Sequence, residues 1–352
     1  MEPILSRVGS QYLPPRFGEA LIREDFANNG AIPHFETVLI TGGTGVIGRW
    51  LLTYLDSANG LLSQSSTVYL VSRNHSRAQA IFADLKNINL QCLKVAEIET
   101  FITRNRPKFI WHLSADTGTS SSDSVMSVLD ADLDMTLHIY RGVERALYAP
   151  NILYTSSGAV YGRPSAPMDA RPNQTPISDL FPDSSMLYGH GKLLSESVLI
   201  ALAKKAAARV NIARLFSFIG PLLPLDKHFA IGNFILDAHL RRPIQLRSRG
   251  ESIRSWLYLG DLARYLLVLA SRSESNIIDI GGEESMTIVS AAHQIATLTG
   301  LEVDVSQVNE VDLDRSVYLP DLVSMKTICN LSGIKTFRQS VISTLDWLAI
   351  ID

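Results

Sequence analysis

The chain has 352 residues with a formal net charge of −3, and 46% of its residues are hydrophobic and 19% charged. This composition is typical of a globular protein large enough for two joined lobes, and without a basic excess nucleic acid is not expected as a main partner. The two cysteines, Cys92 and Cys329, lack metal-ligand spacing, so we expect neither a disulfide framework nor a metal site.

Residues 1–35 are predicted to form an extension ahead of the main domain. They include Pro14 and Pro15 and a short amphipathic stretch, EALIREDFANNG. We expect this extension to clamp the domain surface or to contact a second subunit. We find no apolar core of a secretion signal, and the most apolar stretches, such as 263–270, are too short to cross a bilayer. We therefore expect a cytoplasmic protein with no membrane partner.

From residue 37 onward, strand-like and helix-like segments alternate. Continuous apolar runs at 37–40, 67–72, 108–115 and 151–157 predict strands, with helical stretches between them. This alternation is typical of a parallel sheet that is covered on both faces. We predict a doubly wound α/β domain at 36–215. Residues 216–352, which are richer in proline, are expected to form mainly a smaller lobe, with some segments returning to the first domain.

A glycine-rich turn follows the first predicted strand. Gly42, Gly45 and Gly48 form a G-x-x-G-x-x-G pattern directly before a helix-like stretch. Glycines permit a tight turn and let a ligand approach the backbone, and the helix that follows directs free N–H groups at the same space. The pattern therefore predicts a site for the pyrophosphate of a dinucleotide.

The end of the second strand indicates which dinucleotide is bound. A carboxylate at this place accepts from the 2′-hydroxyl of NAD, whereas an arginine favours the 2′-phosphate of NADP. The sequence has Ser72, Arg73 and Asn74 here, with Arg77 close behind. We therefore expect NADP and keep NAD as the alternative, in which Arg73 stacks on the adenine or faces solvent.

A tyrosine and a lysine four residues apart are the candidate catalytic pair. Tyr188 and Lys192 lie on one face of a predicted helix, and Ser156 and Ser157 end the strand at 151–157. A tyrosine moves a proton efficiently only if its pKa is brought towards neutrality, which a nearby ammonium can do. A serine hydroxyl can hold the same substrate oxygen in line.

Six motifs in the order of one family appear over about residues 37–348. They are TGGTGVIG, WHLSA, YTSSGAVYG, YGHGK, RLFSFIGP and RSWLYLGDLA. The chain thereby resembles an extended short-chain dehydrogenase/reductase of the NAD-dependent epimerase/dehydratase family. The resemblance implies a Rossmann fold with Ser157 as the catalytic serine, Tyr188 as the acid/base, and Lys192 as the partner of Tyr188 that also holds the nicotinamide ribose. The cofactor contacts that it implies are Gly42, Gly45, Val46, Ile47, Gly48, Ser72, Arg73, Ala115, Tyr188 and Lys192.

Most members of this family act on nucleoside-diphosphate sugars, so the resemblance implies such a substrate. Asn233 and Arg254 match the residues that meet the diphosphate, and a guanidinium suits a phosphate because its forked donors pair two oxygens. A predicted strand at 243–248 takes the place beside the nucleobase. Ser157 and Phe216 complete the expected substrate contacts together with Ser217, which departs from the family because many relatives have an asparagine there.

The residues after Ser157 narrow the expected reaction. Family members that dehydrate place an Asp-Glu pair here, and those that epimerise at C3 or C5 or that decarboxylate often have cysteine or glutamate at the second position. This chain has Gly158 and Ala159, which carry no proton. We therefore expect chemistry at one carbinol or keto carbon, most simply C4, by a 4-keto reductase or a 4-epimerase. A dehydratase or decarboxylase with an acid from elsewhere, such as Asp116 or His190, stays open.

Two further expectations rest on the family. Relatives pair two helices from each subunit into a four-helix bundle that includes the tyrosine helix, so we expect a homodimer. Some members of the superfamily bind a dinucleotide without turnover, and they usually lack the tyrosine or the lysine. Because this chain has Ser157, Tyr188 and Lys192, a non-catalytic sensor is the weaker alternative.

Overall fold

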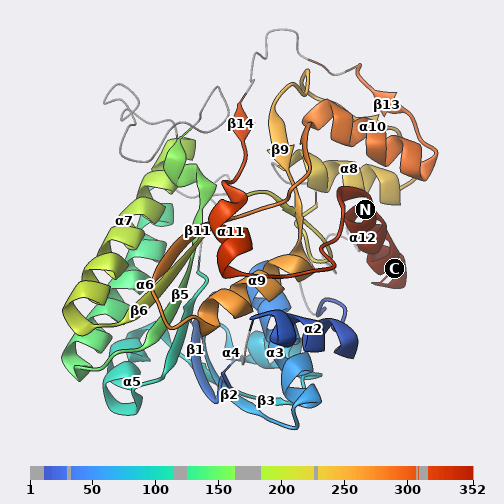
Figure 1. Ribbon diagram of the computed structural model, residues 1–352. Helices are drawn as coiled ribbons and strands as arrows, with labels where there is room; N and C mark the ends of the chain where they lie inside the picture. Colours follow the sequence, from blue (N-terminus) through green and yellow to red (C-terminus); the bar gives the residue numbers. More distant parts are fainter. Residues whose placement is uncertain are drawn as a thin grey trace.

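The computed structural model describes residues 12–29, 33–114, 125–162, 184–225, 229–306, 308 and 316–351. Its centre is a seven-stranded sheet in which all paired strands are parallel (Figure 1). The strand order is β11-β6-β5-β4-β1-β2-β3, so the chain winds outward from β1 in both directions. The strands are β1 Thr37–Thr41, β2 Ser66–Val71, β3 Ile88–Leu93, β4 Phe109–His112, β5 Asn151–Ser157, β6 Arg209–Leu215 and β11 Asn276–Ile280.

Helices cover both faces of this sheet, which confirms the predicted doubly wound α/β fold. In Figure 1, α5, α6 and α7 lie on one face, and α3 and α9 lie on the other. Short helices α4 and η1 connect the strands at the β3 edge. These helices are α3 Val46–Leu61, α4 His75–Ile81, η1 Val95–Glu97, α5 Ile98–Asn105, α6 Val125–Ala146, α7 Ser184–Ala206 and α9 Leu259–Ser271.

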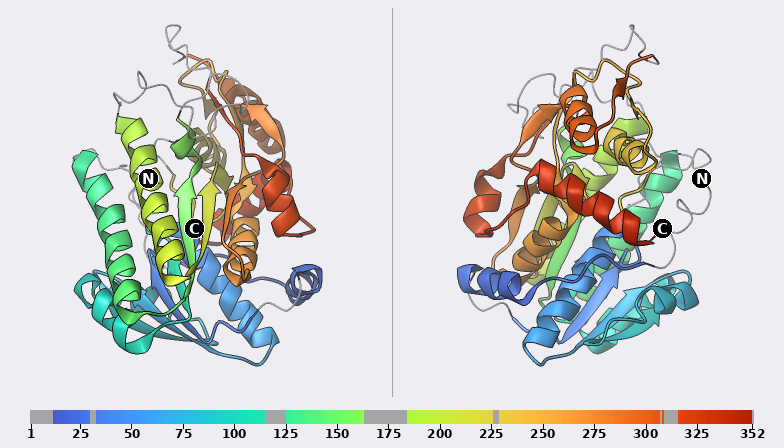
Figure 2. Two further views of the ribbon diagram at one scale, coloured as in Figure 1. Left: turned by 60° about the vertical axis from the view of Figure 1, so that its left-hand side comes forward. Right: turned by 90° about the vertical axis from the view of Figure 1, so that its right-hand side faces the viewer.

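A smaller lobe is formed mostly by the later part of the chain (Figure 2). Its helices α8 and α10 pack on each other and on the C-terminal helix α12. Three short sheets pair β10 with β7, β9 with β12 and β14, and β13 with β8. The remaining elements are η2 Gly158–Tyr161, β7 Phe218–Ile219, α8 Ala230–His239, β8 Ile244–Gln245, β9 Ile253–Ser255, β10 Leu257–Tyr258, β12 Ser285–Thr287, α10 Ile288–Thr299, β13 Val303–Asp304, β14 Val317–Tyr318, α11 Leu322–Ile328 and α12 Phe337–Ile351.

The apolar strands bury side chains on both faces of the sheet. On β1, Val38 and Ile40 belong to a large core shared with α3, α9 and the smaller lobe, whereas Leu39 belongs to a second core beneath α5, α6 and α7. Since successive side chains of a strand point to opposite faces, a continuous apolar run fits only such a doubly covered strand. Each fully buried aliphatic side chain contributes about 1.5–3 kcal/mol, which holds the strand ends at fixed places.

The N-terminal segment is fastened to the domain through buried charges. It contains α2 (Glu19–Asn29), whose Asp25 accepts from Arg264 Nη2 at 2.6 Å and from the Tyr54 hydroxyl at 2.6 Å. Arg264 also donates to Asp261 at 2.7 Å, and its side chain is fully buried. Because a buried charge left unpaired is costly, these contacts fix α2 to α3 and α9.

Two predicted strands are shorter in the structure. The strand expected at 108–115 ends at His112, although Leu113 N still donates to the carbonyl of Thr41. The one expected at 243–248 pairs only over Ile244–Gln245, because β13, its partner, has just two residues. In the described parts of the chain, no helix combines the length and the apolar character needed to cross a bilayer.

Candidate active site

The glycine turn joins β1 to α3 and is closed by backbone on two sides. Gly42 has a φ of 70°, and a Cβ there would lie 2.6 Å from the backbone of Leu113 and Ser114. A Cβ on Gly48 would lie 2.4 Å from the backbone of Gly43. Gly45 is the N-cap of α3, and no side chain caps this helix end. The first turn of α3 is therefore open to an anion, and the cradle fits the pyrophosphate of a dinucleotide.

Arginines gather beyond the end of β2, where sequence reasoning expects the adenosine ribose. Arg73 and Arg77 are exposed, and Asn74 caps α4 by accepting from the backbone N–H of Arg77 at 2.9 Å. Arg49, which the sequence analysis did not select, is buried in the first turns of α3 and donates to the carbonyl of Thr44 at 2.8 Å. Burial and, to a smaller degree, the charge of Arg77 lower the pKa of Arg49 to about 10. Arg49 and Arg77 are thus close enough for their charges to repel each other.

Other predicted cofactor residues have structural contacts of their own. The Ser72 hydroxyl accepts from the backbone N–H of Asn74 at 3.1 Å and so shapes the turn after β2. Val46 and Ile47 are partly buried and pack on the large core. Ala115 lies outside the described residues.

Ser157 ends β5 and stands at the centre of the candidate catalytic group. Its Oγ accepts from the backbone N–H of Ala159 at 3.1 Å and lies 3.3 Å from the hydroxyl oxygen of Tyr318. The Ser157 hydroxyl is also close enough to Tyr188 to lower the pKa of its phenol. A Cβ on Gly158 would lie 2.6 Å from the ring of Phe216, so glycine is required for this packing.

Tyr188 is partly buried at the start of α7. Burial raises its pKa above the ordinary tyrosine value, and the neighbouring Tyr318 and the charge of Asp132 raise it further. The Ser157 hydroxyl acts in the opposite direction. A phenol with a raised pKa keeps its proton at neutral pH. The resting site therefore contains Tyr188 as a phenol.

Lys192 follows Tyr188 by one turn of α7 and is buried. Its Nζ donates to Asp132 Oδ1 at 2.9 Å and to the carbonyls of Thr155 at 3.0 Å and Ser114 at 3.3 Å. It also lies 4.7 Å from the ring centre of Tyr154. Burial lowers the pKa of Lys192, whereas the ion pair with Asp132 opposes this shift. The sequence analysis predicted the lysine but missed its carboxylate partner.

His112 of β4 is buried next to this group and is neutral. Its Nδ1 is 2.8 Å from Thr41 Oγ1, and its Nε2 is 2.9 Å from Thr136 Oγ1. Burial lowers its pKa to about 4, although Asp132 acts in the opposite direction. The imidazole thus joins β1 to α6 without adding charge at neutral pH.

A second charged group supports the strand ends beside Ser157. Ser156 Oγ donates to Glu196 at 2.5 Å, and Glu196 also binds Arg214 at 2.6 Å. Arg214 donates to the Tyr161 hydroxyl at 2.8 Å, and this hydroxyl donates to Asp279 at 2.9 Å. The network ties α7, β5, β6 and β11 together under the site.

Two of the substrate residues predicted from sequence, Phe216 and Arg254, lie beside Tyr318, a contact of Ser157. Phe216 is buried with its ring centre 4.6 Å from that of Tyr318, and the guanidinium of Arg254 lies 5.7 Å from the same ring. Arg254 is held by donating to Ser316 Oγ at 2.8 Å. Asn233 is partly buried in the first turn of α8, and Ser217 is partly buried after β6.

Tyr318 is the site residue that the sequence analysis missed on this side. It comes from β14, pairs in register with Arg254 of β9, and also donates to the carbonyl of Leu215 at 3.3 Å. Burial raises its pKa to about 12, while its bond with Ser157 lowers it. It is a neutral phenol next to Ser157. Of the other candidate acids, His190 is partly buried on α7, two residues after Tyr188, and Asp116 lies outside the described residues.

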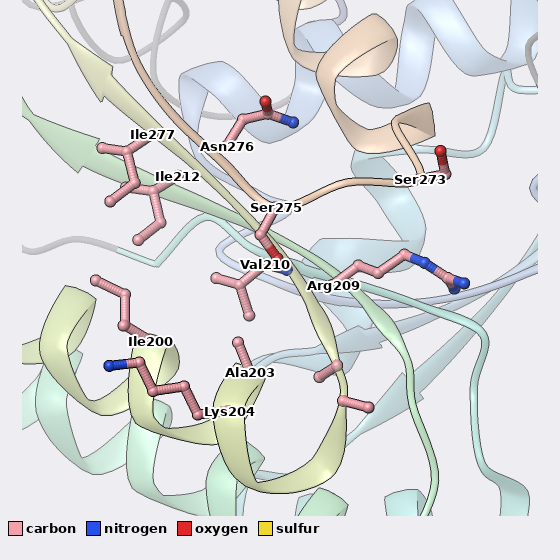
Figure 3. A pocket seen from close by; sticks show the side chains of 12 residues that line it. Ile200, Ala203, Lys204, Arg209, Val210, Ile212, Ser273, Ser275, Asn276 and Ile277 are labelled. Atoms are coloured by element: carbon pink, nitrogen blue, oxygen red, sulfur yellow. Dashed lines mark hydrogen bonds between the residues drawn. The ribbon is translucent and has the colours of Figure 1, made fainter.

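The groove in Figure 3 is not part of this site. It has a volume of about 540 Å³ and lies between α7 and the edge of the sheet, where Arg209 begins β6 and Asn276 begins β11. Ligands of open α/β sheets bind outside the carboxyl ends of the strands, which is the opposite edge.

Comparisons with known proteins bear on the family and on the fold. The model of the NAD dependent epimerase/dehydratase family matches residues 38–281. UDP-glucuronic acid decarboxylase 1 of Xenopus tropicalis is 22% identical over 311 residues, covering 88% of this chain and 71% of the relative. Among solved structures, epimerase Mth375 of Methanothermobacter thermautotrophicus has a TM-score of 0.73 at 20% identity, over 94% of this chain and 96% of that one. UDP-glucuronic acid 4-epimerase of Bacillus cereus, solved with UDP-glucuronic acid and NAD, has a TM-score of 0.71 at 16% identity, over 90% and 100%.

Proposed function

Because the chain belongs to the NAD dependent epimerase/dehydratase family, we propose that it is an NAD(P)-dependent oxidoreductase that acts at C4 of a nucleoside-diphosphate sugar. The observation that carries the proposal is that Ser157 ends β5 beside α7, which carries Tyr188 and, one helical turn later, Lys192. When bound, a nicotinamide dinucleotide supplies hydride transfer at a carbinol or keto carbon. In this proposal, Gly42, Gly45 and Gly48 hold its pyrophosphate.

The protein's own groups would handle the substrate oxygen and its proton. A sugar oxygen held between the hydroxyls of Ser157 and Tyr188 would be aligned by the first and would exchange a proton with the second. We assign the diphosphate to Arg254 and Asn233, because a forked guanidinium pairs two phosphate oxygens and because Arg254 lies beside Tyr318, a contact of Ser157. Residues 216–352 would thus supply most of the substrate side, and 36–215 the cofactor side.

Decarboxylation and dehydration are the two alternative reactions that the relatives suggest. The Xenopus relative is a decarboxylase, and the family name includes dehydratases. Both reactions pass a proton at C5 after oxidation at C4. Gly158 and Ala159 offer no group for it, and Tyr318 with a pKa of about 12 is a poor base near neutral pH. These features favour a 4-keto reductase or a 4-epimerase.

Incubation in deuterated water with a panel of nucleotide sugars and their 4-keto forms tests the reaction. We expect C4 reduction or inversion with C5 and C6 free of deuterium, because only an exchangeable hydroxyl proton comes from Tyr188. Mass spectrometry and NMR of the product provide the measurement. Deuterium at C5 with loss of water would establish dehydration, and deuterium at C5 with release of carbon dioxide would establish decarboxylation.

We propose NADP as the preferred dinucleotide, with Arg73 and Arg77 facing its 2′-phosphate. A charge-assisted hydrogen bond contributes about 1.5–3 kcal/mol. Arg73→Ala should therefore weaken NADPH binding by about tenfold to a hundredfold, and NADH binding much less. Fluorescence titration with both cofactors measures this, with Arg104→Ala, an exposed arginine of α5, as the control. Equal losses for both cofactors, or a wild-type preference for NADH, would contradict the assignment.

The expected homodimer, in which the Tyr188 helix α7 and a second helix of each subunit form a four-helix bundle, stays a prediction. On α7, which packs against α6, Leu194 is 49% exposed.

A further inference from the structure

A buried carboxylate faces the lysine of the candidate catalytic pair. The side chains of Asp132 and Lys192 are 6% and 1% exposed, and Lys192 Nζ lies 2.9 Å from Asp132 Oδ1. The other carboxylate oxygen, Oδ2, accepts from the Tyr154 hydroxyl at 2.7 Å and from Ser195 Oγ at 2.8 Å. With three donors around it, Asp132 is held in its charged form. Burial alone would raise its pKa, but Lys192 and these bonds hold it below the usual range.

This ion pair changes what Lys192 can do for Tyr188. An ammonium near a phenol stabilises the phenolate because opposite charges attract. An ammonium paired at 2.9 Å with a carboxylate presents little net charge to a third group, and the attraction that would draw the proton from the phenol is largely cancelled. Asp132 is itself an anion close enough to Tyr188 to disfavour a second negative charge there.

We propose that Asp132 is a positioning residue that neutralises Lys192 and thereby keeps the proton on the Tyr188 hydroxyl in the resting enzyme. The inference rests on the proposed role of Tyr188 as the acid/base. A tyrosine that starts as a phenol is suited to give its proton to a keto oxygen and unsuited to take one from a carbinol. It follows that the site is suited to keto reduction, which favours a 4-keto reductase over a 4-epimerase.

The charges around Tyr188 come from several elements. Those facing the Tyr188–Lys192–Asp132 group are Tyr318 of β14 with Arg254 of β9 behind it, Glu196 of α7, His112 of β4 and Tyr154 of β5. His112, Tyr154 and Tyr318 are neutral at neutral pH, since burial shifts each pKa towards the neutral form. Glu196 is bound to Arg214, which balances its charge. Among these groups, Asp132 is thus the carboxylate whose charge is balanced by Lys192 and not by an arginine.

Asp132→Asn is the direct test. The amide oxygen can still accept from Tyr154 and Ser195, whereas the negative charge is gone. The phenolate absorbance of Tyr188 is followed against pH as the difference between each protein and the same protein carrying Tyr188→Phe, which removes the signal of the other tyrosines. Asp134→Asn, an exposed carboxylate two residues away on α6, is the matched control for the loss of one charge.

We expect Asp132→Asn to lower the pH at which Tyr188 ionises by about 1–3 units, because Lys192 then acts on the phenol unopposed. Asp134→Asn should leave this pH unchanged. An unchanged Tyr188 titration in a folded Asp132→Asn protein, with thermal unfolding as the check of folding, would overturn the proposal.

The double variant Asp132→Asn with Lys192→Met makes the test independent of a buried, unpaired lysine. It removes both charges at once, so Tyr188 should titrate as in the wild type. A rise in its titration pH would mean that Lys192 already acts on Tyr188 in the wild type, and would overturn the proposal. The titrations use free protein without substrate. Their failure is therefore distinct from failure of the proposed function, which would appear as absent turnover with every nucleotide sugar.

Discussion

Replacement of Tyr188 by phenylalanine is expected to lower kcat by about 10²–10⁴-fold while cofactor affinity stays nearly the same. Phenylalanine keeps the ring and its packing at the start of α7 and removes only the hydroxyl oxygen, whose pKa the neighbouring Ser157 lowers. If that oxygen passes the proton, its removal destabilises the transition state, whereas the binding of substrate and cofactor in the ground state changes little. Steady-state kinetics on the substrate found in the panel, with cofactor titration beside it, provide the measurement.

A tyrosine away from Ser157 serves as the control for this variant. Tyr140 of α6 is partly buried, and its hydroxyl lies 3.5 Å from Glu144. Tyr140→Phe should leave kcat unchanged. A Tyr188→Phe protein with near wild-type turnover would move the acid/base role to another group, and Tyr318, whose hydroxyl lies 3.3 Å from Ser157 Oγ, would be the first to examine.

Gly48→Ala is expected to abolish most cofactor binding and to destabilise the fold. The added Cβ would lie 2.4 Å from the Cα and carbonyl oxygen of Gly43, so either the turn or the start of α3 must move. Overpacking of this kind costs about 1–3 kcal/mol, or roughly 2–4 °C in Tm for each kcal/mol in a large domain. Calorimetric titration with NADPH and NADH measures the loss of affinity, which we expect to exceed about tenfold.

The matched substitution for this experiment is Gly18→Ala. Gly18 precedes α2, and a Cβ there meets no atom within 4 Å. Its Tm and its cofactor affinity should stay at wild-type values. If Gly48→Ala bound the cofactor as well as Gly18→Ala does, the glycine turn would not be the dinucleotide cradle.

The parts of the site that the sequence predicted are those held in short stretches of chain. Gly42, Gly45 and Gly48 lie within seven residues, and the spacing of Tyr188 and Lys192 is that of one helical turn, so local pattern is sufficient to predict them. The positions of the first strands along the chain followed from the apolar runs for the same reason, whereas their order in the sheet depends on pairing between distant segments.

The parts that the sequence analysis missed depend on contacts between distant segments. Asp132 and Lys192 are 60 positions apart, and Ser157 and Tyr318 are 161 apart. Asp132 stands in the run LDADLD with two other aspartates, and nothing in their spacing distinguishes the buried one from the exposed Asp134. Only the packing of α6 on α7 determines which carboxylate reaches the lysine.

The attachment of α2 has a consequence for the order in which the chain can complete its fold during synthesis. Asp25 bonds with Arg264 across 239 positions, and Asn29 donates to the carbonyl of Asn330 across 301. Helix α2 therefore cannot complete these contacts until residues near position 330 have left the ribosome. Contacts of such long separation close late and slowly. Helix α2 is thus expected to dock late, although it is synthesised before all seven strands of the central sheet.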